Sequence, residues 1–171
     1  MYRNGKKEEK NGIKKKYLIA TDSIYAPFEF QENGKYVGID IDIIDAISKF
    51  EGFEYELKPM DFGGIIAALQ SGQIDGAIAG ATITEERKKA VDFSDPYYEK
   101  GLVAVVNKEN TSISKAADLE GKKLAIKNGT AGADYVNENL KGKSEIRVYE
   151  DTVSMFKAVE NGQADAAFED L

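Results

Sequence analysis

The stretch AALQSGQIDGAIAG, Ala67 to Gly80, recurs near the end of the chain as KAVENGQADAAFED, Lys157 to Asp170. The two copies align without a gap, so that Gly72 falls opposite Gly162. Each copy has the pattern of an apolar helix that ends at a glycine and continues into a strand of small residues. The repeat therefore predicts two similar halves, each built from alternating helices and strands.

The rest of the chain shows the same alternation. Strand patterns occur in YLIATD, FEYELKPM, IDGAIAGATI, GLVAVVN, KKLAIKNG and EIRVYE, and the dipeptide Asn33-Gly34 predicts a hairpin turn. Helix patterns occur in IDIIDAISKFEG, FGGIIAALQSG, TEERKKA, AGADYVNENL and TVSMFKAVENG. One apolar stripe of the first of these helices holds Ile41, Ile44, Ile47 and Phe50. Such alternation predicts an α/β fold with mostly parallel sheets.

Composition excludes several kinds of site. The chain has 171 residues and contains neither cysteine nor histidine. It therefore has no disulfides, no thiolate chemistry and no Ser-His-Asp triad, and we expect neither a metal site nor a cofactor. No apolar run is long enough to span a bilayer.

Charge is unevenly distributed along the chain. The net charge is −7, but residues 1–16 hold seven Lys/Arg and two Glu. We expect residues 1–16 to be a disordered basic leader, with a solvated leader favoured over a contact with lipid or nucleic acid. This leader has no apolar core, so it is not an intact secretory signal, and an export signal would be absent from this chain. The acidic remainder argues against nucleic acid as the main partner.

Polar residues follow the predicted strands. In parallel α/β sheets, ligands bind at the carboxyl ends of the strands. The residues at these ends are Asp22, Gly80, Ala81, Thr82, Lys127, Asn128, Gly129, Thr130, Glu169 and Asp170. They are the first candidates for ligand contacts.

Three further residues lie near these ends. Arg87 opens a short helix, where its guanidinium fork suits a carboxylate, although a solvated helix face is the simpler alternative. Tyr25 and Phe62 have aromatic rings that can cover the aliphatic part of a ligand, although such rings lie more often in the core. Asp170 could bind an ammonium group, with an ordinary loop acid as the alternative.

Several segments resemble one family, the polar amino-acid substrate-binding proteins of ABC importers. They are ATDSIYAPFEF, GIDIDI, MDFGGIIAALQSGQIDGAIAGATITEERKKAVDFSDPYY and KNGTAGADY, and the resemblance extends from about Tyr17 to Leu171. It implies the type II periplasmic-binding fold, in which two α/β lobes, each a mostly parallel sheet flanked by helices, close on one amino acid. Glutamine binders are the most similar members.

The resemblance also implies roles for single residues. Asp22 and Lys127 match contacts to the ligand side chain, and Tyr25 and Phe62 match the aromatic lids. For the ligand's backbone, the implied contacts are the Gly80 carbonyl and Asp170 for the ammonium, and Thr82 and Arg87 for the carboxylate. Ala81 adjoins these contacts. Thr130 and Ala131 lie on a loop that presents a backbone N–H, and Glu169 stands where the best-known glutamine binders have histidine.

Glutamine is the ligand that these residues predict. Its neutral amide can donate to Asp22 and accept from Lys127 without leaving a buried charge unpaired. Glu169 leaves the side-chain preference open, because a second acid near Asp22 favours a cationic ligand.

The family continues beyond the end of this chain by roughly a quarter of its length. We therefore expect a truncated chain with a first lobe, residues 17–100, that lacks its C-terminal part, and a second lobe, residues 101–171. The exposed apolar surface of the first lobe would be its main weakness.

The resemblance implies a binding protein without catalytic activity that delivers its ligand to a membrane permease outside the cytoplasm. Two alternatives stay open. One is an amino-acid-sensing domain of a receptor or a binding domain fused to a permease. The other is a cyclohexadienyl dehydratase-like enzyme, for which Glu169 is the only candidate acid.

Overall fold

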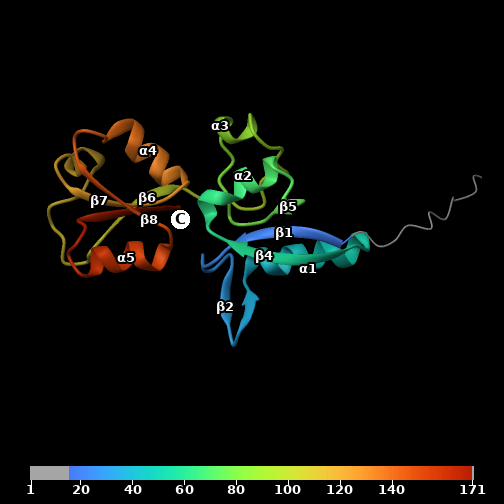
Figure 1. Cartoon of the computed structure of the whole chain (residues 1–171). Helices are drawn as coiled ribbons and strands as arrows, with labels where there is room; N and C mark the ends of the chain where they lie inside the picture. The colour runs from blue at the N-terminus through green and yellow to red at the C-terminus, as the bar shows by residue number, and fades with distance from the viewer. Residues whose placement is uncertain (1–15, 171) are drawn as a thin grey trace, which may run out of the picture.

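The structure is a computed structural model that describes residues 16–170. Its strands are β1 (Lys16–Asp22), β2 (Phe30–Glu32), β3 (Lys35–Val37), β4 (Glu54–Met60), β5 (Gly76–Ala77), β6 (Leu102–Val106), β7 (Lys123–Lys127), β8 (Glu145–Tyr149) and β9 (Ala166–Asp170). Its helices are α1 (Ile39–Glu51), α2 (Ile65–Gln70), α3 (Glu85–Lys88), α4 (Ala131–Asn139) and α5 (Thr152–Glu160), with 3-10 turns η1 (Phe62–Gly64) and η2 (Ala116–Leu119). The elements gather around two separate sheets, which we call the first and the second lobe (Figure 1).

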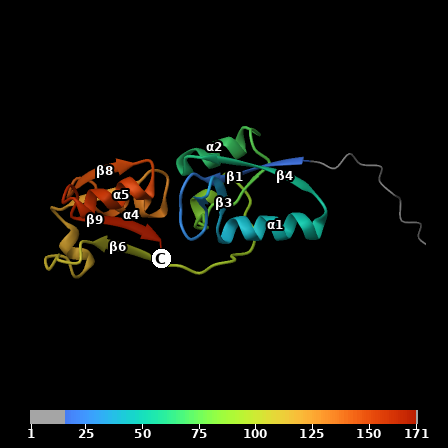
Figure 2. The same cartoon turned by 90° about the horizontal axis from the view of Figure 1, so that it is seen from below.

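The first lobe is built on a parallel sheet of strand order β4-β1-β5, with α1 and α2 on its opposite faces (Figures 1 and 2). A separate antiparallel hairpin joins β2 to β3. Its turn residues Asn33 and Gly34 have φ angles of 51° and 77°, as the sequence predicts for a tight hairpin turn.

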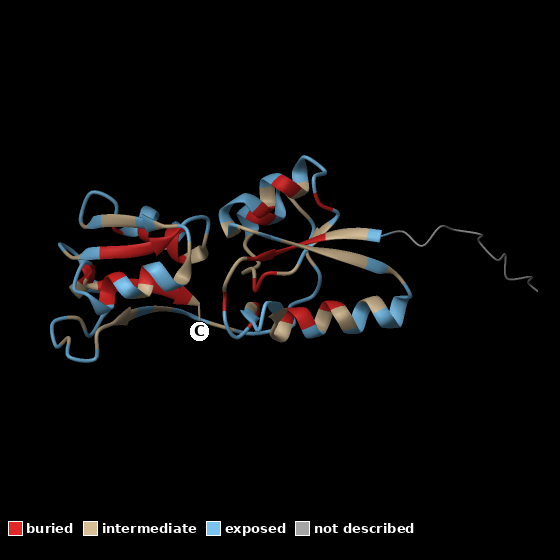
Figure 3. Cartoon of the chain, turned by 60° about the horizontal axis from the view of Figure 1, so that its bottom comes forward, coloured by how far each residue is buried: buried red, intermediate tan, exposed pale blue. Residues whose placement is uncertain are grey.

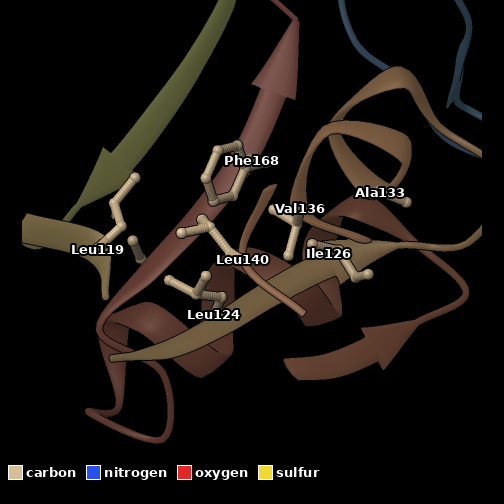
Figure 4. Packing of buried hydrophobic residues seen from close by; sticks show 8 residues of the cluster. Leu119, Leu124, Ile126, Ala133, Val136, Leu140 and Phe168 are labelled. Carbon is tan, nitrogen blue, oxygen red and sulfur yellow. The ribbon is translucent and has the colours of Figure 1, made fainter. Parts of the chain in front are cut away.

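The second lobe is built on a sheet of strand order β6-β9-β7-β8, in which only β6 runs antiparallel. Successive residues of β7 point to opposite faces: Leu124 and Ile126 pack against α4, whereas Ala125 packs against α5. Figure 4 shows the α4 side of this core, where Phe168 of β9 and Leu140 join the cluster. Both lobes are thus mostly parallel α/β layers, as predicted.

Burial is concentrated in the central strands β1, β7 and β9 and on the inner faces of the helices (Figure 3). In α1, Ile41 and Ile44 are each 8% exposed, but Ile47 and Phe50 of the same predicted stripe are 44% and 88% exposed. The second half of α1 therefore presents apolar surface to solvent.

The strand predicted in IDGAIAGATI is mostly wrong. Only Gly76 and Ala77 pair as β5, at the edge of the first sheet, and they pair with β1 alone. One further bond joins the Ile78 amide to the Ala20 carbonyl at 2.9 Å, and Gly80 then turns the chain with a φ of 52°. Pairing with β1 thus ends at Ile78, just before this turn.

The predicted leader and the predicted lobe boundary can be compared with the structure. Residues 1–15 of the predicted leader lie outside the described residues, and Lys16, which we assigned to the leader, begins β1. The predicted boundary near residue 100 lies in the segment between α3 and β6, which holds no helix or strand and connects the two lobes (Figure 2). Within residues 16–170 no helix has the length and apolarity needed to cross a membrane.

Candidate ligand-binding site

The carboxyl ends of β1, β7 and β9 meet between the two lobes and enclose a cavity of about 20 Å³. It is lined by Asp22, Tyr25, Phe62, Gly80, Arg87, Lys127, Thr130, Ala131, Glu169 and Asp170. Every lining residue is one that the sequence singled out. Four of the candidates do not line it: Ala81, Thr82, Asn128 and Gly129.

At one end of the cavity, Asp22 of the first lobe and Lys127 of the second form a buried ion pair, side chain to side chain. Lys127 also donates to the Thr152 hydroxyl at 3.3 Å. The ammonium faces the rings of Tyr25 and Phe62, with centroids 5.5 and 5.7 Å away. The sequence predicts two separate ligand contacts at Asp22 and Lys127, but in the structure the two groups bind one another.

Arg87 is 9% exposed, so the alternative of a solvated helix face is excluded for this residue. Thr84 caps its short helix by accepting the Arg87 amide at 3.2 Å. The guanidinium donates to the carbonyl of Thr82 at 2.6 Å and, across the cleft, to that of Gly129 at 2.7 Å. It lies 5.4 Å from the centroid of the Phe62 ring. Burial lowers the pKa of Arg87, but a guanidinium stays charged throughout the physiological range.

At the opposite end, Asp170 is surrounded by donors. The Thr82 hydroxyl donates to its carboxylate at 2.8 Å, and the Tyr25 hydroxyl donates to its backbone carbonyl at 3.2 Å. The Lys100 ammonium lies 3.1 Å from the same carboxylate oxygen. Thr82 thus takes part in the site through both its hydroxyl and its carbonyl, although it does not line the cavity.

Glu169 is 9% exposed and points one carboxylate oxygen at the Asp170 amide, 3.0 Å away. Its other oxygen is buried without a hydrogen-bond partner. Burial raises the pKa of Glu169, and together with Asp170 this acid adds to the effect of burial in raising the pKa of Tyr25. The wall near Tyr25 therefore combines an uncharged phenol with two acids.

The loop before α4 completes the cavity wall. The Thr130 hydroxyl caps α4 by accepting the Ala133 amide at 3.2 Å, and Ala131 is the first residue of the helix. An N-terminus in this place presents unpaired amides and the positive end of the helix dipole to the cavity.

Sequence reasoning missed two residues of the site, Lys100 and Asp40. The buried carboxylate of Asp40 accepts the Gly80 amide at 2.6 Å and the Tyr97 hydroxyl at 2.9 Å. Gly80 has a φ of 52°, and a Cβ there would lie 2.8 Å from the Tyr25 ring, so glycine is required. An acid directly after Gly38 and Ile39, where α1 begins, was the available signal for Asp40.

A larger groove of about 570 Å³ lies on the second lobe, over β6, η2 and α4. Its walls are mostly apolar, and none of the predicted site residues lines it. Among the described residues, no group of three acidic side chains is arranged to hold a metal ion.

Comparison with known proteins identifies the family. Residues 17–151 match the model of the bacterial extracellular solute-binding proteins, family 3. The L-cystine-binding protein TcyJ of Escherichia coli (strain K12) is 36% identical over 155 residues, which cover 90% of this chain and 58% of that protein. The chain thus spans less than two thirds of this relative.

Solved structures agree with the family match. An ancestral arginine-binding protein bound to arginine is 46% identical, with a TM-score of 0.86 over 91% of this chain and 70% of the other. An ancestral arginine-binding protein bound to glutamine is 45% identical, with a TM-score of 0.86 over 93% and 71%. These relatives are binding proteins rather than enzymes, in agreement with the prediction from the sequence, and the fold is the predicted periplasmic-binding-protein-like II fold. The chain belongs to the bacterial extracellular solute-binding proteins, family 3.

Proposed function

We propose that the chain captures a polar amino acid, glutamine in the first place, between its two lobes and delivers it to the permease of an ABC importer outside the cytoplasm. The observation that carries this proposal is the meeting of Arg87, Asp170 and the Gly80 carbonyl around one cavity between the lobes. A guanidinium on one side and a carboxylate with a carbonyl on the other match the two charged groups that every amino acid has.

The α-carboxylate is assigned to Arg87. In this structure its guanidinium donates two hydrogen bonds to backbone carbonyls, that of Thr82 in the first lobe and that of Gly129 in the second. A carboxylate accepts both donors of such a fork and carries the opposite charge, so it is the stronger acceptor. The first turn of α4 supplies further amides beside it.

The α-ammonium is assigned to Asp170 and the Gly80 carbonyl. Thr82 fixes the Asp170 carboxylate by a 2.8 Å hydrogen bond, and Asp40 fixes the Gly80 amide. Both partners are therefore held in place by hydrogen bonds to neighbouring groups before a ligand arrives, which lowers the entropic cost of binding.

Entry of a ligand requires the lobes to separate. A cavity of about 20 Å³ has room for about one water molecule but not for an amino acid. Polar contacts join the lobes across it, among them Asp22 with Lys127 and Arg87 with Gly129. An amino acid that replaces these direct contacts with bridging ones would shift the two lobes from an open to a closed arrangement around it.

The ligand side chain is assigned to the end with Asp22 and Lys127. Glutamine can donate its amide N–H to Asp22 and accept from Lys127, so that both members of the buried pair keep a partner. Arginine would pair with Asp22 and the nearby Glu169 but would bring a second cation beside Lys127. The two ancestral relatives, one bound to arginine and one to glutamine, make these the two ligands to compare.

The proposal is tested by calorimetric titration of the chain with glutamine and arginine, using Arg87→Met and Lys88→Met as matched variants. Lys88 lies on the same short helix but is exposed. We expect glutamine to bind more tightly than arginine, and Arg87→Met to weaken glutamine at least about 100-fold, or about 3 kcal/mol. Lys88→Met should leave the affinity unchanged.

Two results would contradict the proposal in different ways. If arginine binds and glutamine gives no binding signal, the site assignment stands but the proposed ligand is wrong. A glutamine affinity of Arg87→Met within a few-fold of the parent would show that Arg87 does not hold the carboxylate. Unfolding in urea, measured for both variants, separates loss of the fold from loss of the contact.

A further inference from the structure

The ammonium of Lys100 lies in a cage of oxygen atoms and aromatic rings. It donates to the Gly80 carbonyl at 2.7 Å and to the Tyr25 hydroxyl at 3.2 Å, and lies 3.1 Å from the Asp170 carboxylate. The rings of Tyr25 and Phe28 face it with centroids 5.1 and 5.3 Å away. An ammonium has three N–H donors, and each has an oxygen partner here. The side chain is only 11% exposed.

The geometry of this cage suits a primary ammonium. A carboxylate, a carbonyl and a hydroxyl converge on one point, and two aromatic faces add cation–π attraction. A second cation cannot enter the same space, because two ammonium groups on one carboxylate oxygen would repel one another by several kcal/mol.

We propose that Lys100 is an intramolecular competitor for the α-ammonium of the amino acid, so that it lowers the affinity of the chain for amino acids. The proposal rests on the proposed function, which assigns the ligand's ammonium to Asp170 and the Gly80 carbonyl, the same two groups that Lys100 binds. Displacement of Lys100 is then a step in the binding of every amino acid.

The place of Lys100 in the chain makes it an effective competitor. Leu102 pairs with Asp170 in the antiparallel ladder of β6 and β9, which lies within the second lobe. This ladder keeps Lys100, two residues before Leu102, close to Asp170 whether or not the lobes separate. Gly80 and Tyr25 belong to the first lobe, so the complete cage forms only when the lobes meet. A tethered ammonium of this kind has a high effective concentration at Asp170.

The competition has a direction that depends on the ligand. A compound with an α-amino group must displace Lys100. Its apparent affinity is the intrinsic affinity multiplied by the fraction of molecules in which the cage is free of Lys100. A compound with a carboxylate and an amide but no amino group leaves Lys100 in place, with its charge on Asp170. Lys100 therefore discriminates against amino acids relative to their deaminated analogues.

The experiment compares the full chain with Lys100→Met, which keeps the length of the side chain but removes the ammonium. The exposed Lys108→Met serves as the control for loss of one positive charge. Calorimetry measures the affinity for glutamine and for glutaramate, which is glutamine without its α-amino group. We expect Lys100→Met to tighten glutamine at least about tenfold and to leave glutaramate unchanged or weaker. Lys108→Met should change neither.

A second measurement does not depend on any ligand. The chain has no cysteine, so Lys49→Cys on α1 and Lys157→Cys on α5 provide exposed positions for a pair of spin labels, one on each lobe. Without added amino acid, removal of the Lys100 cage should broaden the distance distribution towards longer distances. Lys108→Met should leave it unchanged.

The outcomes separate the two proposals. Equal glutamine affinities of the parent and Lys100→Met would overturn the competition, although glutamine binding would still support the proposed function. If no amino acid binds either chain, the proposed function fails and the distances alone decide. A distribution that Lys100→Met broadens then supports the Lys100 contact, and an unchanged one overturns it.

Discussion

The two copies of the repeated segment have the same local structure in both lobes. Gly72 and Gly162 end their helices with φ angles of 71° and 70°. The carboxylates of Asp75 and Asp165 then accept a backbone amide of the neighbouring strand, β1 or β7, at 2.9 and 2.8 Å. The aspartate of each copy thus ties the repeat to the strand beside it.

The strands that follow are different. The first copy yields the two residues of β5 at a sheet edge, whereas the second yields the five residues of β9 between β6 and β7. The turn chemistry is local and is repeated with the sequence, but strand length depends on the neighbours that the rest of the lobe supplies. Because its strand is short, the first copy leaves Gly80 and Thr82 in a loop, whereas the second holds Glu169 and Asp170 in a sheet.

The largest expected effect concerns Glu29, a buried acid of the first lobe. Glu29 is fully buried with both carboxylate oxygens unpaired, and burial, with Asp40 and Asp22 nearby, raises its pKa to about 9 from an ordinary 4.5. The folded chain thus holds this proton more tightly than the unfolded one. The stability from Glu29 is complete below about pH 4.5 and is lost as the pH rises towards 9.

Glu29→Gln should remove this loss, because the amide is uncharged at every pH. We expect the variant to resemble the parent near pH 5 and to exceed it in stability by several kcal/mol at pH 9. Urea unfolding across this range measures the difference, with the exposed Glu32→Gln as the control. Parallel curves for parent and Glu29→Gln would contradict the assignment.

The next effect compares matched positions of the two copies. Ala167 of β9 is fully buried against Ala125, Met155 and Ala158, whereas Ala77, at the same place in the first copy, is exposed. Ala167→Leu should therefore lower the free energy of unfolding by about 3 kcal/mol through overpacking, and Ala77→Leu by less than about 0.5 kcal/mol. Similar unfolding free energies for the two variants would show that the copies are packed alike.

Substitutions of the two repeat aspartates, Asp75 and Asp165, should differ less in their effect on stability than the two alanine substitutions. Ala in place of Asp165 removes the acceptor of the first amide of β7, and we expect a cost of about 2 kcal/mol. Asp75→Ala should cost only about 1 kcal/mol, because Asp75 is more exposed and water can replace its carboxylate more easily. A larger loss for Asp75→Ala in denaturant unfolding would reverse this ranking.

The smallest effect compares two glycines of the second lobe, one before β7 and one after it. Gly121 and Gly129 have φ angles of 76° and 73°, so alanine strains the backbone equally at both. A Cβ at Gly129 would lie 2.7 Å from the Cα of Gly63 in the first lobe, whereas one at Gly121 would meet nothing within 4 Å. Gly129→Ala should therefore hinder closure.

For this pair we expect a loss of glutamine affinity of about tenfold in Gly129→Ala and none in Gly121→Ala, with similar losses of stability. Calorimetry and unfolding on the same samples give both numbers. If Gly121→Ala weakens binding as much, backbone strain rather than contact between the lobes explains the loss.

Much of the fold could be predicted because its signals are local. The cap of Thr84, the turn at Gly34 and the helix end at Gly52 depend on residues within one turn of the chain. The site residues could be proposed because the carboxyl ends of parallel strands meet at one edge. Their convergence on a single cavity follows from the same rule.

The features that the sequence did not predict depend on contacts between residues far apart in the chain. The pairing of Asp22 with Lys127 and the place of Lys100 both arise from such contacts. Each of these charged residues also suits an ordinary surface position, so the pattern alone cannot say which partner it has. The short β5 was missed for a related reason, since strand length depends on pairing partners.

The most direct test of the account is a crystal structure of the chain grown with glutamine. We expect glutamine between the lobes, its carboxylate on Arg87 and its ammonium on Asp170 and the Gly80 carbonyl, with the Lys100 ammonium displaced. Glutamine bound elsewhere, or no glutamine in the cleft while Lys100 still lies on Asp170 at a saturating concentration, would contradict it.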